Sequence, residues 1–104
     1  MNPFNPEMEG GIDEDVQEIV KEPSMFKVLL LNDDYTTMEF VIEVLIVVFA
    51  KSPEAAMEIM LSVHQKGSGV CGVYPFEIAE TKAETVHSLA RERGFPLRCA
   101  LEEV

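Results

Sequence analysis

Three polar residues of this chain have the types that would bind a primary ammonium group. Asn32 and Asp33 stand side by side, followed by Asp34 and Tyr35, and His64 lies farther along the chain. An ammonium group carries three N–H donors. An amide oxygen, a carboxylate and one neutral imidazole nitrogen supply three acceptors, and the carboxylate adds an ion pair. These residues predict a site for a free amino group, provided that the fold brings the loop and the histidine together.

A stripe of apolar residues accompanies His64. Met57, Met60 and His64 stand at i, i+3 and i+7 of an apolar segment with Val63 beside them, so a helix would place them on one side. Methionine adapts to apolar partners of different shapes. Burying a large apolar side chain there would contribute roughly 1.5–3 kcal/mol. The alternative is a core histidine at the end of an apolar stripe, and the sequence leaves both interpretations open.

Catalytic and metal-binding interpretations of the polar residues are weaker. Asp33 and Asp34 are adjacent, so on an extended segment their side chains point to opposite sides and cannot easily share a proton or a substrate. The aspartates, histidines and cysteines have no familiar metal-ligand spacing. Neither Cys71 nor Cys99 is surrounded by a nucleophile-turn motif. We therefore expect a protein that is not an enzyme and that holds no metal ion or other cofactor.

Composition and net charge limit the binding partners and the cellular compartment that we expect for this chain. The chain has 104 residues and a formal net charge of −11. This charge disfavours binding to nucleic acid and to anionic membranes, because both bind clustered Lys and Arg. The longest apolar run, Val44 to Ala50, is far short of the roughly 20 residues that cross a bilayer. Two cysteines without a secretory signal favour reduced thiols in the cytoplasm, although a disulfide between them stays open.

The first 24 residues differ in composition from the rest. They hold seven acidic residues against Lys21 alone, together with three prolines and two glycines. A segment with so little apolar surface cannot offset the entropy that is lost on ordering. We predict a disordered acidic tail over residues 1–24 and a folded domain over residues 25–104.

The predicted domain begins with a strand and a helix. Residues 25–31 are apolar on both alternating faces, which indicates a strand largely covered on both sides. The polar residues 32–35 favour a turn. Thr36 stands three residues before Glu39, the spacing of a capping box, and apolar residues then recur at helical spacing. We predict a helix over about residues 37–50.

A second helix and a second strand follow. Ser52 and Pro53 provide an N-cap and a first helical position, and this helix runs to about Lys66, before Gly67. Residues 70–74 then form an apolar segment between a glycine and a proline, which predicts a strand.

A third helix and a last strand complete the chain. The helix is closed by Gly94, and residues 97–101 are partly alternating. The apolar stripe of this helix comprises Ile78, Ala79, Lys82, Thr85, Val86, Leu89 and Ala90. The order β-α-α-β-α-β predicts an α+β fold, with three helices packed on a small three-stranded antiparallel sheet.

Several long stretches of the chain resemble the ClpS family of Clp protease adaptors. They are residues 23–36, 38–41, 59–65, 69–74, 80–82 and 96–99. The resemblance covers about residues 23–103 in order. It implies the same β-α-α-β-α-β fold and an adaptor without catalytic residues. It further implies binding to proteins that begin with Phe, Leu, Trp or Tyr, and their delivery to the N-terminal domain of a Clp unfoldase, usually ClpA.

The resemblance also implies roles for individual residues. Asn32, Asp33 and His64 would bind the free α-amino group of an N-degron peptide, and Asp34 would shape or charge the entrance. The side-chain pocket would be lined by Thr36, Met38, Val41, Met60, Val63 and Leu97, with Met60 as the gate against β-branched residues. Glu77 and Lys82 would contact the unfoldase, and residues 1–24 would serve substrate hand-off. A regulatory module that docks on the unfoldase without binding N-termini is the alternative.

Two features depart from the family pattern. Thr37 stands where the family commonly has proline, at the predicted first helical position. The run from Val44 to Phe49 is more apolar than we expect for this helix, and part of it should face solvent.

Overall fold

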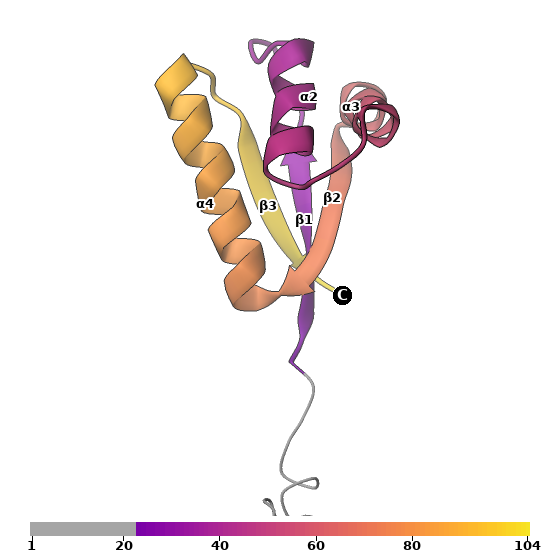
Figure 1. Ribbon diagram of the computed structural model, residues 1–104, viewed down its shortest axis with the longest axis vertical. Helices are drawn as coiled ribbons and strands as arrows, with labels where there is room; N and C mark the ends of the chain where they lie inside the picture. The colour runs from indigo at the N-terminus through magenta and orange to yellow at the C-terminus, as the bar shows by residue number, and fades with distance from the viewer. Residues whose placement is uncertain (1–22) are drawn as a thin grey trace, which may run out of the picture.

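The structure, a computed structural model, describes residues 23–104, so residues 1–22 of the predicted tail lie outside the described residues. The elements follow in the order β1-α2-α3-β2-α4-β3 (Figure 1). Their bounds are β1 Met25–Leu31, α2 Met38–Val47, α3 Pro53–Lys66, β2 Ser68–Pro75, α4 Phe76–Arg93 and β3 Arg98–Glu103. The predicted order of strands and helices is confirmed, although both later strands extend beyond their predicted bounds.

The three strands form one antiparallel sheet with β1 between β2 and β3. Val28 and Leu30 are fully buried on the face that the helices cover (Figure 1). Leu29 pairs with Val70, which is 44% exposed, on the other face. The prediction that β1 is largely covered on both sides holds fully for one face and in part for the other, where Leu29 and Leu31 are partly buried. Helices cover one face, and on the other the apolar side chains shield one another across neighbouring strands.

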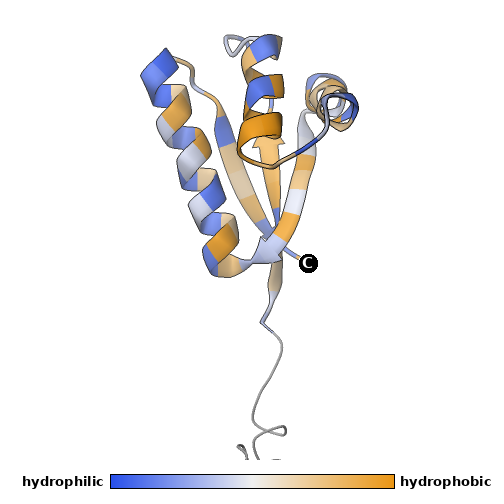
Figure 2. Ribbon diagram, viewed as in Figure 1, coloured by the Kyte–Doolittle hydropathy of each residue, from blue (hydrophilic) through white to orange (hydrophobic). Residues whose placement is uncertain are grey.

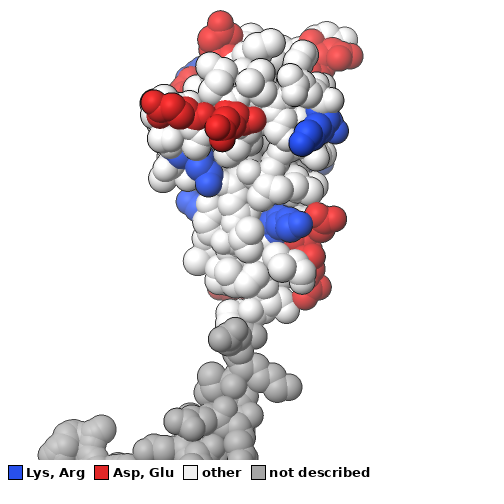
Figure 3. Space-filling view, turned by 90° about the vertical axis from the view of Figure 1, so that its right-hand side faces the viewer, with Lys and Arg blue, Asp and Glu red and all other residues white. Residues whose placement is uncertain are grey.

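β2 is an edge strand that carries no charged residue. Figure 3 shows the corresponding side of the molecule, on which a broad uncharged area separates charged side chains at the margins. The hydropathy colouring in Figure 2 shows apolar residues concentrated in the strands and in the last turn of α2. Most acidic residues of the described part lie on the exposed sides of the three helices and on β3, and none lies on β2.

α2 begins one residue later than the predicted capping box. Thr37 is the N-cap, and its hydroxyl oxygen accepts the Phe40 backbone N–H at 3.2 Å. Its extended backbone, with φ −75° and ψ 153°, lets the side chain face the helix N-terminus. The capping box at Thr36 and the placement of Thr37 at the first helical position are both wrong. The Thr36 hydroxyl instead donates to Asp33.

α2 ends at Val47, three residues before the predicted end at Ala50. Phe49 turns into the core, Ala50 takes a left-handed conformation with φ 56°, and Lys51 N–H donates to Leu45 O at 3.0 Å. Val47 is 68% exposed, which confirms that part of the apolar run faces solvent. Among residues 23–104, no helix is both long enough and apolar enough to cross a membrane.

α3 has the predicted ends. Ser52 is the N-cap, its hydroxyl accepts Ala55 N–H at 3.1 Å, and Pro53 occupies the first turn. Gly67 closes the helix in the left-handed conformation, with φ 92°, and its N–H donates to Val63 O. The capping prediction for α3 is therefore confirmed at both ends.

α4 packs on the sheet along a line of small residues. Ala79, Ala83, Val86 and Ala90 are its buried residues, at a spacing of four, three and four. Ile78, predicted for this stripe, is 49% exposed, and Thr85 is exposed as well. The predicted stripe was too wide because alanines let the helix approach the sheet along a narrow seam.

α3 packs on β2 at a place where the strand has no side chain. A Cβ on Gly69 would lie 2.9 Å from Val63 Cγ2 and 3.1 Å from Ile59 O. Glycine at this position therefore permits the close approach of the helix that carries Met60 and His64.

We predict that Gly69→Ala lowers the free energy of unfolding by about 1–3 kcal/mol, because the new methyl group meets a β-branched side chain and a helix carbonyl. Urea unfolding followed by circular dichroism measures the change. Val73→Ala is the control, since it changes a side chain of β2 that is 44% exposed and adds no atom to the interface with α3. Equal stability of Gly69→Ala and the unsubstituted chain would contradict the close packing of α3 on β2.

Candidate functional site

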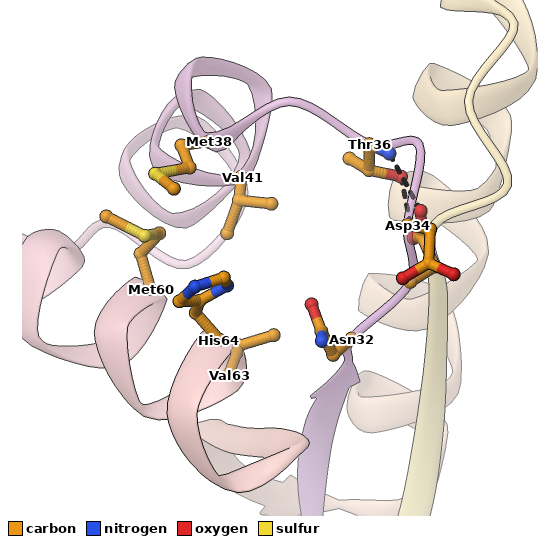
Figure 4. A pocket seen from close by; sticks show the side chains of 9 residues that line it. Asn32, Asp34, Thr36, Met38, Val41, Met60, Val63 and His64 are labelled. Atoms are coloured by element: carbon orange, nitrogen blue, oxygen red, sulfur yellow. Dashed lines mark hydrogen bonds between the residues drawn. The ribbon is translucent and has the colours of Figure 1, made fainter.

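A cavity of about 280 Å³ lies between the end of β1, the start of α2 and the last turns of α3 (Figure 4). Its lining consists of Asn32, Asp33, Asp34, Thr36, Met38, Val41, Met60, Val63 and His64. All nine were predicted as amino-group, entrance or pocket residues. The structure therefore gathers in one place residues that are far apart in the sequence.

A backbone hydrogen bond joins the two segments that supply the polar residues. Asn32 N–H donates to Gly67 O at 3.0 Å. Gly67 follows the last turn of α3, which contains His64. The bond thus anchors the residue after β1 to the C-terminus of α3 and fixes the distance between the loop and the histidine.

Asp33 organises the loop that follows β1. Its Oδ1 accepts the backbone N–H groups of Tyr35 at 2.8 Å and of Thr36 at 2.7 Å. Its Oδ2 accepts the Thr36 hydroxyl at 2.7 Å (dashed lines in Figure 4). A carboxylate has about four acceptor positions, so these three bonds leave about one for a ligand. The side chain that was predicted as an amino-group acceptor is largely committed to its own loop.

The same hydrogen bonds lower the pKa of Asp33. Partial burial acts to raise the pKa, but the bonds from the Thr36 backbone, the Thr36 hydroxyl and the Tyr35 backbone together outweigh it. The net pKa lies below the ordinary aspartate value, so the carboxylate is ionised near neutral pH. The site therefore holds a fixed negative charge at its polar end.

Asn32 and His64 face each other across the polar end of the cavity (Figure 4). Both side chains are exposed, which contradicts the core interpretation of His64. Within residues 23–104, neither side chain takes part in an intramolecular hydrogen bond. Their polar atoms therefore remain available to a ligand.

The other end of the cavity is apolar. Met38 and Val41 project from the first turn of α2, and Met60 and Val63 project from α3 toward them (Figure 4). Met38 is 50% exposed, whereas the other three are buried. The two helices therefore form opposite walls, with one flexible methionine in each.

Leu97 does not line this cavity. It is 3% exposed and belongs to the hydrophobic core, where it packs at the connection between α4 and β3. The residue is a large apolar side chain that the core needs, and nothing in its sequence context distinguishes a core leucine from a pocket leucine.

Glu77 and Lys82 lie on α4, outside the lining of the cavity. Glu77 is exposed in the first turn of the helix. Lys82 is partly buried, and its Nζ donates to Val48 O at 2.9 Å. Its cationic end is therefore already in contact with α2.

The two cysteines are free thiols, so the alternative of a disulfide between them is wrong. Burial raises the pKa of both Cys71 and Cys99 to about 12. Both thiols are protonated at neutral pH and are poor nucleophiles. In the described part of the chain, no group of three or more potential ligand residues is placed to hold a metal ion.

Two contacts of the site escaped the sequence-based prediction. The bond from Asn32 to Gly67 joins positions whose proximity no local pattern reveals. The bonds from Thr36 to Asp33 do have a local signal. An aspartate three residues before a threonine forms such turns, and the same signal competes with the capping box proposed for Thr36.

Fold and cavity together define a small α+β binding domain whose pocket combines acceptors at one end with apolar walls at the other. The family model for "ATP-dependent Clp protease adaptor protein ClpS" matches residues 21–100. The chain belongs to the ClpS family and is a Clp protease adaptor.

Relatives and a solved structure agree with this assignment. The ATP-dependent Clp protease adapter protein ClpS of Nitratidesulfovibrio vulgaris is 58% identical over 98 residues, which cover 92% of this chain and 98% of the relative. The protein of the same name from Oleidesulfovibrio alaskensis is 64% identical over 89 residues, 86% of each chain. The structure of Agrobacterium tumefaciens ClpS2 bound to L-phenylalaninamide matches with a TM-score of 0.77 and 44% identity, over 80% of this chain and 100% of that one.

We predict that Asp33→Asn destabilises the chain by about 1 kcal/mol at pH 7, the order of a lost capping interaction. Because the folded-state pKa of Asp33 lies below its unfolded value, the charge contributes stability above about pH 4, and this contribution is lost as the pH falls through the folded pKa. Urea unfolding at a series of pH values should show the difference shrinking as the pH falls below about 4.

Asp34→Asn is the control for this experiment. Its carboxylate is exposed and accepts no intramolecular hydrogen bond within residues 23–104. A constant difference between Asp33→Asn and the unsubstituted chain at every pH would show that the charge of Asp33 does not stabilise the loop.

Proposed function

We propose that this adaptor binds proteins whose first residue is Phe, Leu, Trp or Tyr and delivers them in the cytoplasm to a ClpA-type unfoldase. The observation that carries the proposal is the joint lining of one cavity by Asn32 and His64 at one end and by two methionines at the other. Neither end alone selects an N-terminus. Together they fit a free amino group attached to a bulky apolar side chain.

The polar end is suited to an α-ammonium group. The Asn32 amide oxygen and a neutral His64 nitrogen accept two of its three N–H donors, and the remaining position on Asp33 serves the third or holds a bridging water. The negative charge of Asp33 and the exposed Asp34 at the entrance favour a cation over a neutral, acetylated terminus. The loop is held in place before the ligand arrives, which reduces the ordering cost of binding.

The apolar end is suited to one large side chain. A cavity of about 280 Å³ is slightly smaller than the 300–1,000 Å³ of most small-molecule pockets. Burial of an aromatic or leucine side chain contributes roughly 1.5–3 kcal/mol. Met60 stands in the wall as the gate that disfavours β-branched residues. The solved relative binds L-phenylalaninamide, a molecule with a free amino group, an apolar side chain and an amide in place of a carboxylate.

Delivery requires a second surface that contacts the unfoldase, and we propose that α4 provides it. Glu77 is exposed at the start of this helix and supplies a charge to a protein partner. Lys82 lies farther along the same helix and retains two N–H donors beyond its bond to Val48. The pocket and this surface involve different elements, so a substrate and an unfoldase domain can be bound at the same time. Residues 1–24, the predicted tail, would then serve hand-off.

We predict that a labelled peptide beginning with a free Phe binds, whereas acetyl-Phe and Ala peptides bind at least about tenfold more weakly. The acetylated peptide loses the ammonium, and the Ala peptide loses most of the apolar burial. Fluorescence anisotropy measures the three dissociation constants. No binding of any peptide would favour the alternative, a regulatory module that only docks on the unfoldase.

His64→Ala tests the polar end in the same assay. We expect a loss of about 1–3 kcal/mol in binding free energy for the Phe peptide, because the ammonium loses an acceptor. The matched control is Gln65→Ala, which changes an exposed neighbour outside the cavity lining. Unchanged affinity of His64→Ala would show that the amino group lies elsewhere.

We predict that Glu77→Lys weakens binding to the isolated N-terminal domain of a ClpA-type unfoldase by about tenfold, because reversed charge opposes a complementary surface. The affinity for the Phe peptide should not change. Glu84→Lys is the control, since it makes the same change at an exposed position farther along α4. Equal losses in the two variants would argue against a local contact at Glu77.

A further inference from the structure

α2 is one wall of the pocket and is held from its opposite side by α4. In a helix each residue turns by about 100°, so Met38 and Val41 lie on one side of α2, whereas Phe40 and Glu43 lie on the other. Figure 1 shows α2 between α4 and α3 in the upper part of the molecule. A shift of α2 toward α3 would therefore narrow the pocket.

Lys82 of α4 contacts the C-terminal end of α2. Its Nζ donates to the carbonyl of Val48, the C-cap residue, at 2.9 Å. The same ammonium lies 6.0 Å from the Phe49 ring centroid and 5.4 Å from that of Tyr74. α2 has no basic residue in its own last turn. A cation supplied by α4 thus satisfies a carbonyl and favours the helix dipole from outside the helix.

Arg93 of α4 contacts the first turn and the middle of α2. Its guanidinium donates to Glu43 Oε2 at 2.8 Å and lies 5.2 Å from the Phe40 ring centroid. Phe95, just after α4, adds a ring contact to Phe40 at 5.1 Å. The ion pair alone is exposed and weak. Combined with the stacking on a buried ring, it fixes Phe40 and Glu43, the side of α2 that is remote from the pocket.

An apolar pocket of this kind tends to close when it is empty. Met38 is 50% exposed and faces Met60 and Val63 across the cavity, so its contact with them would remove apolar surface from water. Contacts that hold α2 back toward α4 oppose this closure. Large ligand side chains need the full width of the pocket and would suffer most from a partial collapse.

We propose that Lys82 and Arg93 are positioning residues that hold α2 against α4, keep the pocket open and thereby set the relative affinity for larger and smaller N-terminal side chains. The inference rests on the proposed function. It gives Lys82 a role inside the adaptor that needs no unfoldase. It also gives Arg93, to which the resemblance assigned no role, a part in specificity.

The test compares Lys82→Met and Arg93→Gln with the conservative variants Lys82→Arg and Arg93→Lys. Dissociation constants are measured for peptides beginning with Trp, Phe and Leu, without an unfoldase, at a temperature where circular dichroism shows every variant folded. In Lys82→Met and Arg93→Gln, we expect the affinity for the Trp peptide to fall by a factor about three times larger than the factor for the Leu peptide. The conservative variants Lys82→Arg and Arg93→Lys should restore part of the lost affinity. The control is Arg91→Gln, an exposed change on the same helix.

Amide hydrogen exchange gives a readout that is independent of any ligand. Lys82→Met and Arg93→Gln should accelerate exchange in α2 while exchange in α3 stays as in the unsubstituted chain. Equal weakening of all three peptides, or unchanged exchange in α2, would overturn the proposal. If the unsubstituted chain binds no peptide, the proposed function fails, and the exchange data still decide whether α4 holds α2 in place.

Discussion

The hydrogen bond from Asn32 N–H to Gly67 O connects the end of β1 to the end of α3, and the pocket exists because these two ends meet. Gly67 can present this carbonyl because it takes a left-handed conformation at the helix end. The close approach of α3 to β2 at Gly69 helps to hold α3 in this position relative to the end of β1. Two glycines and one backbone bond thus place His64 beside the loop that follows the central strand.

The remaining parts of the site differ in how firmly they are held. Asp33 is tied to its own loop by three hydrogen bonds and contributes a fixed charge. Asn32 and His64 are exposed and ready to pair with a ligand. The methionine walls adapt in shape because thioether side chains are flexible. A rigid polar end with an adaptable apolar end fits the proposed function, in which one pocket requires an amino group yet accepts several bulky side chains.

Local patterns predicted the elements well and their exact limits less well. The Ser52-Pro53 start and the glycine end of α3 follow from capping chemistry that acts within a few residues, and both were found. The start of α2 was misplaced because Thr36 and Thr37 are both capable caps, and the competing bond to Asp33 decided between them. The cavity lining was predicted through the family resemblance, except that Leu97 is a core residue here. The partial burial of the outer face of the sheet was not predicted, because apolar alternation does not say what packs on each side.

Placing both Glu77 and Lys82 on α4 has a consequence for how substitutions in this helix are interpreted. Glu77 is exposed in the first turn of α4 and does not line the pocket, so its effects on an unfoldase complex would be direct. Lys82 holds the end of α2 through Val48 and lies over two aromatic rings. On the inference drawn above, its removal would change the support of a pocket wall even when no partner is present. If Lys82 also contacts the unfoldase, as proposed, a loss of substrate delivery on substituting it would combine two physical effects, which peptide binding by the isolated adaptor separates.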